Sequence, residues 1–264
     1  MAFDLGPYEQ YHLAAIVLVG TYGALALVLW LAQWSAYAPF IRSFRGIAQN
    51  FLTVINVIFA LNLAFLANDT WNARDRGRDA VYQEAGSLRN ILDLARELPQ
   101  PAGRDVAAAV VDYARASAAA EWPQLARRQE SGEAAAALEA LIARVAAASI
   151  GGAVDPIVAA QLLGQALDVR ATRELRIALS QTHVNPLKWL GMAFLGFLTL
   201  ISIAMVHVDL PRAQLLSVLL FATAAAPTAA IILIHGNPFQ HPFAVSPAPI
   251  ADIVAWSATA SPAR

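Results

Sequence analysis

The chain has 264 residues, of which 58% are hydrophobic and 14% are charged, whereas an ordinary soluble protein carries about a quarter charged residues. Its formal net charge of -1 offers no basic surface to nucleic acid, so we expect no nucleic-acid partner. It has no cysteine, which excludes disulfides, thiol catalysis and cysteine-ligated metals.

Four apolar runs without a charged residue dominate the pattern. They are Tyr11–Trp34, Gly46–Asn68, Trp189–Val206 and Ala213–Ile234. Each has the length that a helix needs to cross a bilayer, and a helix satisfies its own backbone hydrogen bonds in lipid. We therefore expect an all-α integral membrane protein, in which two plus two transmembrane helices flank a helical soluble domain and contact the lipid bilayer.

The composition changes sharply between these segments. Most of the 18 basic and 19 acidic residues fall between Asp69 and Arg176. The start of the chain lacks the positive region of a signal peptide, so the first span is expected to remain in the mature protein. The expected segments are a first helix pair at 1–68, an extramembrane domain at 69–185, a second helix pair at 186–235 and a proline-rich tail at 236–264.

The second span is interrupted by amides and ends in a polar, aromatic segment. An amide that faces lipid is costly, so these side chains are expected to face other helices or water. Just beyond, Trp71 and Arg74 either anchor the helix at the membrane interface or form a pore entrance. The interrupting amides are Gln49, Asn50, Asn56, Asn62 and Asn68.

The polar block between the spans has helical periodicity. Apolar residues recur at three-, four- and seven-residue intervals from Val81 to Leu98, so the second span is expected to continue as one long helix to Pro99. Later helices are expected at Arg104–Glu121, which Trp122-Pro123 should stop, from an N-cap at Ser131 to Ser149, and from Asp155-Pro156 to Thr182. The proline-rich tail after His235 is expected to contain no helix.

No group of residues points to catalysis or to a metal. The histidines are dispersed, and His235 with His241 has no carboxylate near it in sequence. Nucleophile, phosphate-loop and paired-carboxylate motifs do not occur. Glu84 and Glu121 could act as acid or base, but single helical glutamates are usually solvated or paired, here with Arg89 or Arg115 one or two turns away. We expect no enzymatic activity, metal or cofactor.

Several short motifs, in this order, resemble the bestrophin-like domain family of bacterial and plant membrane proteins, a family with no settled function. The Trp71–Arg74 part is more distantly similar to the segment that follows the pore-lining second helix of bestrophin anion channels. The motifs are Asn68–Arg74, Tyr82–Arg89, Glu121–Pro123, Asn185–Leu190, Asn237–Phe239 and Val245–Pro249.

The distant similarity implies a homo-oligomer, pentameric in bestrophins, whose second spans surround an axial pore for small inorganic anions such as chloride or bicarbonate. The spacing of Val57, Leu61, Phe65 and Asn68, at three or four residues, places their side chains on one stripe of a helix. An apolar constriction there could gate by dewetting. The pore-lining residues implied by the similarity are Asn50, Val57, Leu61, Phe65 and Asn68.

Two other readings remain open. The stripe could be a packing surface inside one four-helix subunit, and the protein could be a non-conducting scaffold or regulator that binds a cytosolic partner through its helical domain. The acidic calcium clasp of animal bestrophins does not occur, so calcium gating is not expected. We expect a bacterial inner-membrane location, with the domain and both termini in the cytoplasm. Five basic residues flank the membrane on the domain's side and three on the other.

Overall fold

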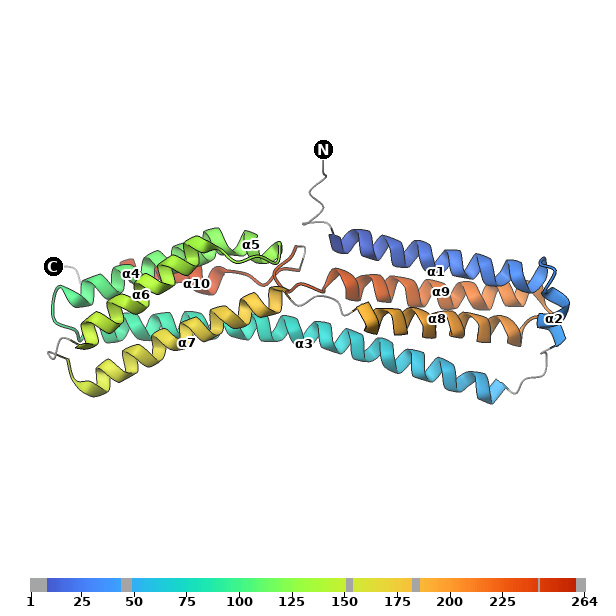
Figure 1. Cartoon of the computed structure of the whole chain (residues 1–264), viewed down its shortest axis with the longest axis horizontal. Helices are drawn as coiled ribbons and strands as arrows, with labels where there is room; N and C mark the ends of the chain where they lie inside the picture. Colours follow the sequence, from blue (N-terminus) through green and yellow to red (C-terminus); the bar gives the residue numbers. More distant parts are fainter. Residues whose placement is uncertain (1–8, 44–48, 151–153, 182–185, 242, 260–264) are drawn as a thin grey trace, which may run out of the picture. The chain divides into compact units, whose positions relative to one another are not determined.

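The computed structural model describes residues 9–43, 49–150, 154–181, 186–241 and 243–259. Most of these residues are helical and none of them forms a strand (Figure 1), which confirms the expected all-α fold. The chain divides into two compact units. The membrane unit comprises Met1–Trp71 and His183–Gly236, and the helical unit comprises Asn72–Thr182 and Asn237–Arg264.

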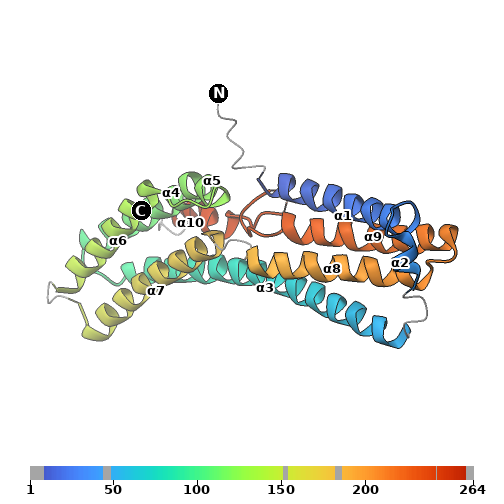
Figure 2. The ribbon, with the colours of Figure 1, turned by 45° about the vertical axis from the view of Figure 1, so that its right-hand side comes forward.

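The membrane unit is built from long apolar helices. Among the described residues, four helices are long and apolar enough to cross a membrane, as expected. Helices α1, α9 and α8 lie side by side (Figure 1, Figure 2). The elements of this unit are α1 (Glu9–Gln33), the short α2 (Ala38–Ser43), the first part of α3 (Gln49–Ala95), α8 (Pro186–Val206) and α9 (Pro211–Ile234).

Small and branched residues pack the core of the membrane unit. Small side chains let helices approach closely in lipid, where packing rather than the hydrophobic effect holds them together. Polar side chains find partners: Gln33 donates to Gln214 at 2.7 Å, and Gln214 donates to the carbonyl of Ala204 at 2.8 Å. The core residues are Leu25, Val28, Leu200, Ala204, Val218 and Ala222.

The helical unit begins where α3 continues past the membrane unit to Ala95, so the single long helix predicted from the periodicity is confirmed. The two helix starts that were predicted from the capping residues Ser131 and Asp155 are also confirmed. The hydroxyl of Ser131 accepts a bond from the Ala134 amide at 3.3 Å, and Asp155 accepts one from the Ile157 amide at 2.7 Å. The other elements are α4 (Ala102–Ala116), the π-helical turn η2 (Ser117–Glu121), α5 (Trp122–Ala126), α6 (Gly132–Ile150), α7 (Pro156–Gln181) and α10 (Ala248–Thr259).

Two expectations about this unit are wrong. Trp122-Pro123 does not stop a helix, because the chain passes through η2 and Pro123 lies in the first turn of α5, where a missing amide is tolerated. The tail does contain a helix, α10, and it packs as part of the helical unit. Before α10, the indole of Trp122 donates to the carbonyl of Val245 at 2.8 Å, and Asn237 donates to the carbonyl of Leu125 at 2.9 Å.

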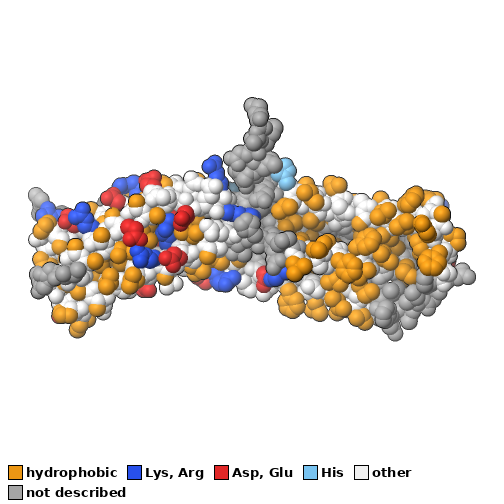
Figure 3. Space-filling view, in the orientation of Figure 1, with side chains coloured by type: hydrophobic (Ala, Val, Ile, Leu, Met, Phe, Trp, Pro, Cys, Tyr) orange, Lys and Arg blue, Asp and Glu red, His pale blue; other side chains and the backbone are white. Residues whose placement is uncertain are grey.

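The two units differ in their surfaces. On the face that Figure 3 shows, charged side chains gather over the helical unit, and hydrophobic side chains cover the helices of the membrane unit. Large apolar residues such as Val19, Phe65 and Leu190 are more than half exposed. A surface of this kind is expected where lipid or another protein subunit replaces water.

Candidate pore-lining face of helix α3

One face of the first part of α3 packs against α8 and α9 of the membrane unit. The ring centroid of Phe59 lies 5.4 Å from that of Phe221 on α9. A β-carbon added to Gly196 on α8 would lie 3.2 Å from the Phe59 ring. The glycine therefore makes room for Phe59, which holds this part of α3 against α8 and α9.

The predicted stripe lies on the opposite side of α3. At about 100° per residue, Val57, Leu61 and Asn68 point about 160–200° away from Phe59. The side chains of Val57 and Leu61 are each 52% exposed and that of Phe65 is 66% exposed. Asn68 is also exposed. The chain's other spans thus leave this stripe uncovered, so it is not a packing surface inside the described part of one subunit.

The amides of α3 lie in different environments. Asn50 is in the first turn of α3, but its side chain lies outside the part of the chain that the structure describes. Asn62 is exposed and donates to the carbonyl of Ile58 at 3.0 Å, a local bond that lowers the cost of an amide in lipid. Asn56 is half-buried, and its buried side-chain oxygen has no partner among the described residues.

Polar residues follow the stripe where the apolar run ends. Lys188 on α8 donates to Asp69 at 2.7 Å, and both side chains are more than half exposed. Trp71 is 59% exposed, and Arg74, the first basic residue beyond the span, is also exposed. An indole and a guanidinium in these positions suit either a headgroup contact or a pore entrance.

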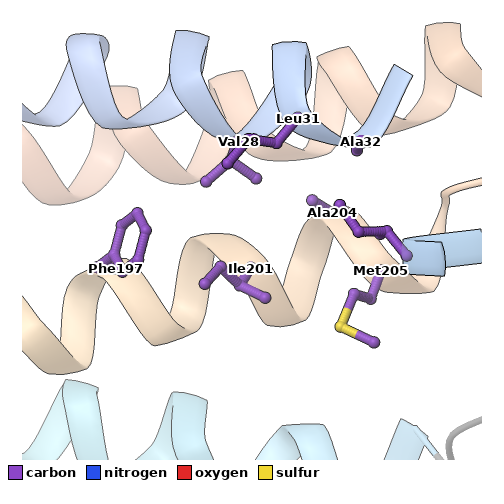
Figure 4. A pocket seen from close by; sticks show the side chains of 8 residues that line it. Val28, Leu31, Ala32, Phe197, Ile201, Ala204 and Met205 are labelled. Carbon is purple, nitrogen blue, oxygen red and sulfur yellow. The ribbon is translucent and has the colours of Figure 1, made fainter. Parts of the chain in front are cut away.

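The two pockets described in the membrane unit are mainly apolar. A pocket of about 230 Å³ between α1 and α8 is lined by apolar side chains such as Val28, Phe197 and Met205 (Figure 4). A second pocket of about 390 Å³ is also mainly apolar, and its Thr21 hydroxyl donates to the carbonyl of Val17. An ion entering either pocket would lose its hydration without replacement. Within the described residues, the exposed face of α3 is thus the better candidate for an ion path.

The helical unit contains a buried charge cluster that the sequence analysis missed. We define the charge cluster as Glu84, Tyr113, Glu121, Arg173 and Arg176. The guanidinium of Arg176 donates to both oxygens of Glu84, at 2.7 and 2.9 Å, and to Glu121 at 3.0 Å. Arg173 donates to Glu121 at 2.9 Å, and the Tyr113 hydroxyl donates to Glu84 at 2.7 Å.

The formal charges of the cluster sum to zero, and its side chains are almost completely buried. Both glutamates and Arg176 are fully buried, and Arg173 is 6% exposed. Arg176 also lies over the Trp122 ring, 4.8 Å from its centroid, and donates to the Ser117 hydroxyl at 3.0 Å. Burial raises the pKa of Tyr113, and the carboxylate of Glu84 raises it further. Burial alone would lower the pKa of Arg176, but Glu84, Tyr113 and Glu121 together outweigh burial, so this pKa is raised.

The expected partners of the two glutamates are therefore wrong. Arg89 and Arg115 are near in sequence, yet Arg115 pairs with Asp112 at 3.2 Å and Arg89 has no carboxylate partner among the described residues. The actual partners lie on α7, more than 50 residues from Glu121 and more than 90 from Glu84. One signal was available for Glu121, which directly follows the apolar, helix-forming run Ala118–Ala120. The hydrogen bonds of the cluster join α3, α4, η2 and α7.

A comparison with known protein families identifies the family of this chain. No curated protein and no solved structure matches it. The sequence profile of the bestrophin-like domain matches residues 19–250, which include three of the four membrane helices, most of the first one (Tyr11–Gln33) and most of the helical unit. This chain belongs to the bestrophin-like domain family.

Proposed function

We propose that this protein is a homo-oligomeric channel that conducts small anions, such as chloride or bicarbonate, along an axial pore lined by α3. The observation that carries the proposal is the uncovered apolar stripe of Val57, Leu61 and Phe65, opposite the face that packs on α8 and α9. If copies of the chain surround an axis, this stripe can face the axis and not the lipid. The pentamer of bestrophin channels is the arrangement that we propose.

The ends of the stripe suit an anion path. Asn68 supplies an amide that can donate to a partly dehydrated anion, and Arg74 supplies positive charge beyond it. The apolar middle of the stripe would act as a constriction that closes by dewetting. Because the two pockets described in the membrane unit are mainly apolar, the oligomer axis is the path that needs the least rearrangement.

We propose that the protein resides in the bacterial inner membrane with the helical unit and both termini in the cytoplasm. Basic residues near the membrane are more frequent on the side of the helical unit, which is the side that the positive-inside rule assigns to the cytoplasm. Protease access to the helical unit in inverted but not in right-side-out vesicles would test this orientation.

Chloride flux in liposomes tests conduction directly. Purified protein should release a chloride gradient faster than empty vesicles, and Leu61→Ala should increase the flux because it widens the constriction. Leu190→Ala is the matched control, since Leu190 is 68% exposed but lies on α8. Flux no greater than in empty vesicles would refute conduction and favour the scaffold reading. An equal increase of the chloride flux in Leu61→Ala and Leu190→Ala would refute the assignment of the stripe as the pore-lining face.

A further inference from the structure

A groove in the helical unit lies between α3 and the segment that leads into α10. We call it the arginine groove and define it by Arg74, Arg78 and Arg89 on α3, together with residues 244–252. Its volume is about 660 Å³. The buried side chains of Val81, Ala85 and Val245 also line it. It is therefore a mixed surface, in which apolar side chains lie beside the three arginines and two aspartates, Asp75 and Asp252.

The three arginines of the groove are exposed and have no carboxylate partner among the described residues. Arg78 lies 6.0 Å from the centroid of the exposed Tyr82 ring. Arg76, Arg104 and Arg127 likewise have none among the described residues, but six other arginines of the same unit do have carboxylate partners. These are Arg96, Arg115, Arg144, Arg170, Arg173 and Arg176. The groove thus retains guanidinium groups whose donors are available to an anion from outside the chain.

Gly86 leaves space in the groove. It lies inside a long helix, where glycine is less favourable than alanine by about 1 kcal/mol, and a β-carbon added there would meet nothing within 4 Å. No contact within the chain requires this glycine. An apolar or aromatic part of a ligand could occupy the space beside Gly86 and Tyr82, which both line the groove.

The length of the groove favours a soluble ligand over a lipid headgroup. Arg89 follows Arg74 by 15 residues on the same helix, which corresponds to about 22 Å along the helix axis. The headgroup region of one leaflet is only about 5–8 Å thick. A headgroup could contact Arg74 near the end of the span, but it could not also reach Arg89.

We propose that the arginine groove binds a soluble anion that carries a phosphate group and an apolar or aromatic part. Arg89 and the nearest of the other guanidinium groups would hold the phosphate through paired, charge-assisted hydrogen bonds. Asp75 and Asp252 also border the groove, so they would repel the anion and confine it to the arginines. This site is separate from the proposed ion path and does not depend on conduction.

Equilibrium binding of naphthyl phosphate to the full-length protein in detergent tests the proposal. The double variant Arg78→Gln, Arg89→Gln should weaken binding by at least about tenfold, because each arginine loses a charge-assisted hydrogen bond. Asp252→Asn should strengthen binding by about two- to fivefold, since it removes a like charge at an exposed site. Gly86→Leu should weaken binding of naphthyl phosphate but not of inorganic phosphate, because it fills the apolar part of the groove.

The matched control is Arg144→Gln, Arg170→Gln, which removes the same charge from exposed arginines outside the groove. Circular dichroism and size-exclusion profiles should be unchanged in all variants. If the control weakened the binding of naphthyl phosphate equally, the effect would depend on net charge alone, and the proposed site would be overturned. Absence of binding, or binding of phosphatidylglycerol vesicles without binding of naphthyl phosphate, would overturn the assignment to a soluble anion.

Discussion

Arg176 is the residue on which the interior of the helical unit depends most. Its side chain is fully buried and joins Glu84 on α3 to Glu121 on η2. Two buried carboxylates that face the same region repel each other strongly unless cations lie between them. With Arg173, Arg176 brings the formal charge of the cluster to zero. Four segments that are distant in sequence must therefore meet in one arrangement to satisfy these groups.

Replacement of Arg176 by leucine should destabilise the protein strongly. Loss of one partner leaves buried carboxylates uncompensated, which costs about 3–5 kcal/mol. Arg170→Leu is the matched control, since Arg170 pairs with Glu139 at an exposed position, and such pairs contribute about 0–1 kcal/mol. Thermal unfolding followed by tryptophan fluorescence should show a large decrease in Tm for Arg176→Leu and a small one for Arg170→Leu. Similar Tm values would contradict the assigned role.

Tyr113 should make stability sensitive to alkaline pH. Its folded-state pKa is raised by burial and by Glu84, so the folded state retains the phenolic proton after the unfolded chain has lost it. The contribution is complete below the unfolded pKa of about 10 and is lost progressively as pH rises above it. Tm measured from pH 8 to 11 should fall more steeply for the wild type than for Tyr113→Phe.

At neutral pH the same Tyr113→Phe variant should be less stable by about 1–2 kcal/mol, because Glu84 loses one hydrogen bond. Tyr82→Phe serves as the control, since Tyr82 is 60% exposed. It should change neither the Tm at pH 7 nor the slope above pH 10. Parallel slopes for the wild type and Tyr113→Phe would contradict the alkaline effect.

At the scale of the element, α3 has two faces with different roles. Phe59 fills the space above Gly196 and contacts Phe221, so Phe59→Ala should leave a cavity and reduce stability by up to about 3 kcal/mol. Leu61→Ala changes an exposed position on the same helix and should have little effect on the stability of one subunit. Thermal denaturation of the two variants in detergent compares the faces, and equal losses would contradict this division.

Local sequence signals predicted the elements well where the signal was itself local. Ser131 and Asp155-Pro156 mark helix starts because a side chain next to the first turn bonds to it. The apolar runs predicted the spans because a segment in lipid must satisfy its backbone hydrogen bonds within itself, as a helix does. The prolines after His235 were misleading, because they occupy the irregular segment and the first turn of α10 and leave the rest of that helix free.

The charge cluster could not be predicted in the same way. Glu84 and Arg176 are 92 residues apart, and nothing near either residue specifies the other. A glutamate on a helix is normally solvated, so its burial depends on how α3, α4 and α7 pack. The exposed stripe of α3 was a different case. Its helical spacing was visible in the sequence, but only the packing of Phe59 shows that the stripe lies on the uncovered side.

At the scale of the whole molecule, the proposed channel requires several copies of the chain. A single subunit has apolar pockets in its membrane unit and an exposed apolar stripe on α3. If copies surround an axis with these stripes inward, position 61 of every copy forms one ring. A single substitution there would place a ring of identical groups in the ion path.

Leu61→Glu should therefore reverse or abolish the anion preference. A ring of carboxylates in a narrow, poorly hydrated path attracts cations and repels anions. Leu61→Gln has a similar shape without the charge and should conduct without reversing selectivity. Reversal potentials measured in planar bilayers under a salt gradient separate the two variants, since the sign of the potential reports which ion carries the current. An unchanged potential in Leu61→Glu would show that Leu61 faces lipid or a packed interface, and the path would then have to follow another face of α3.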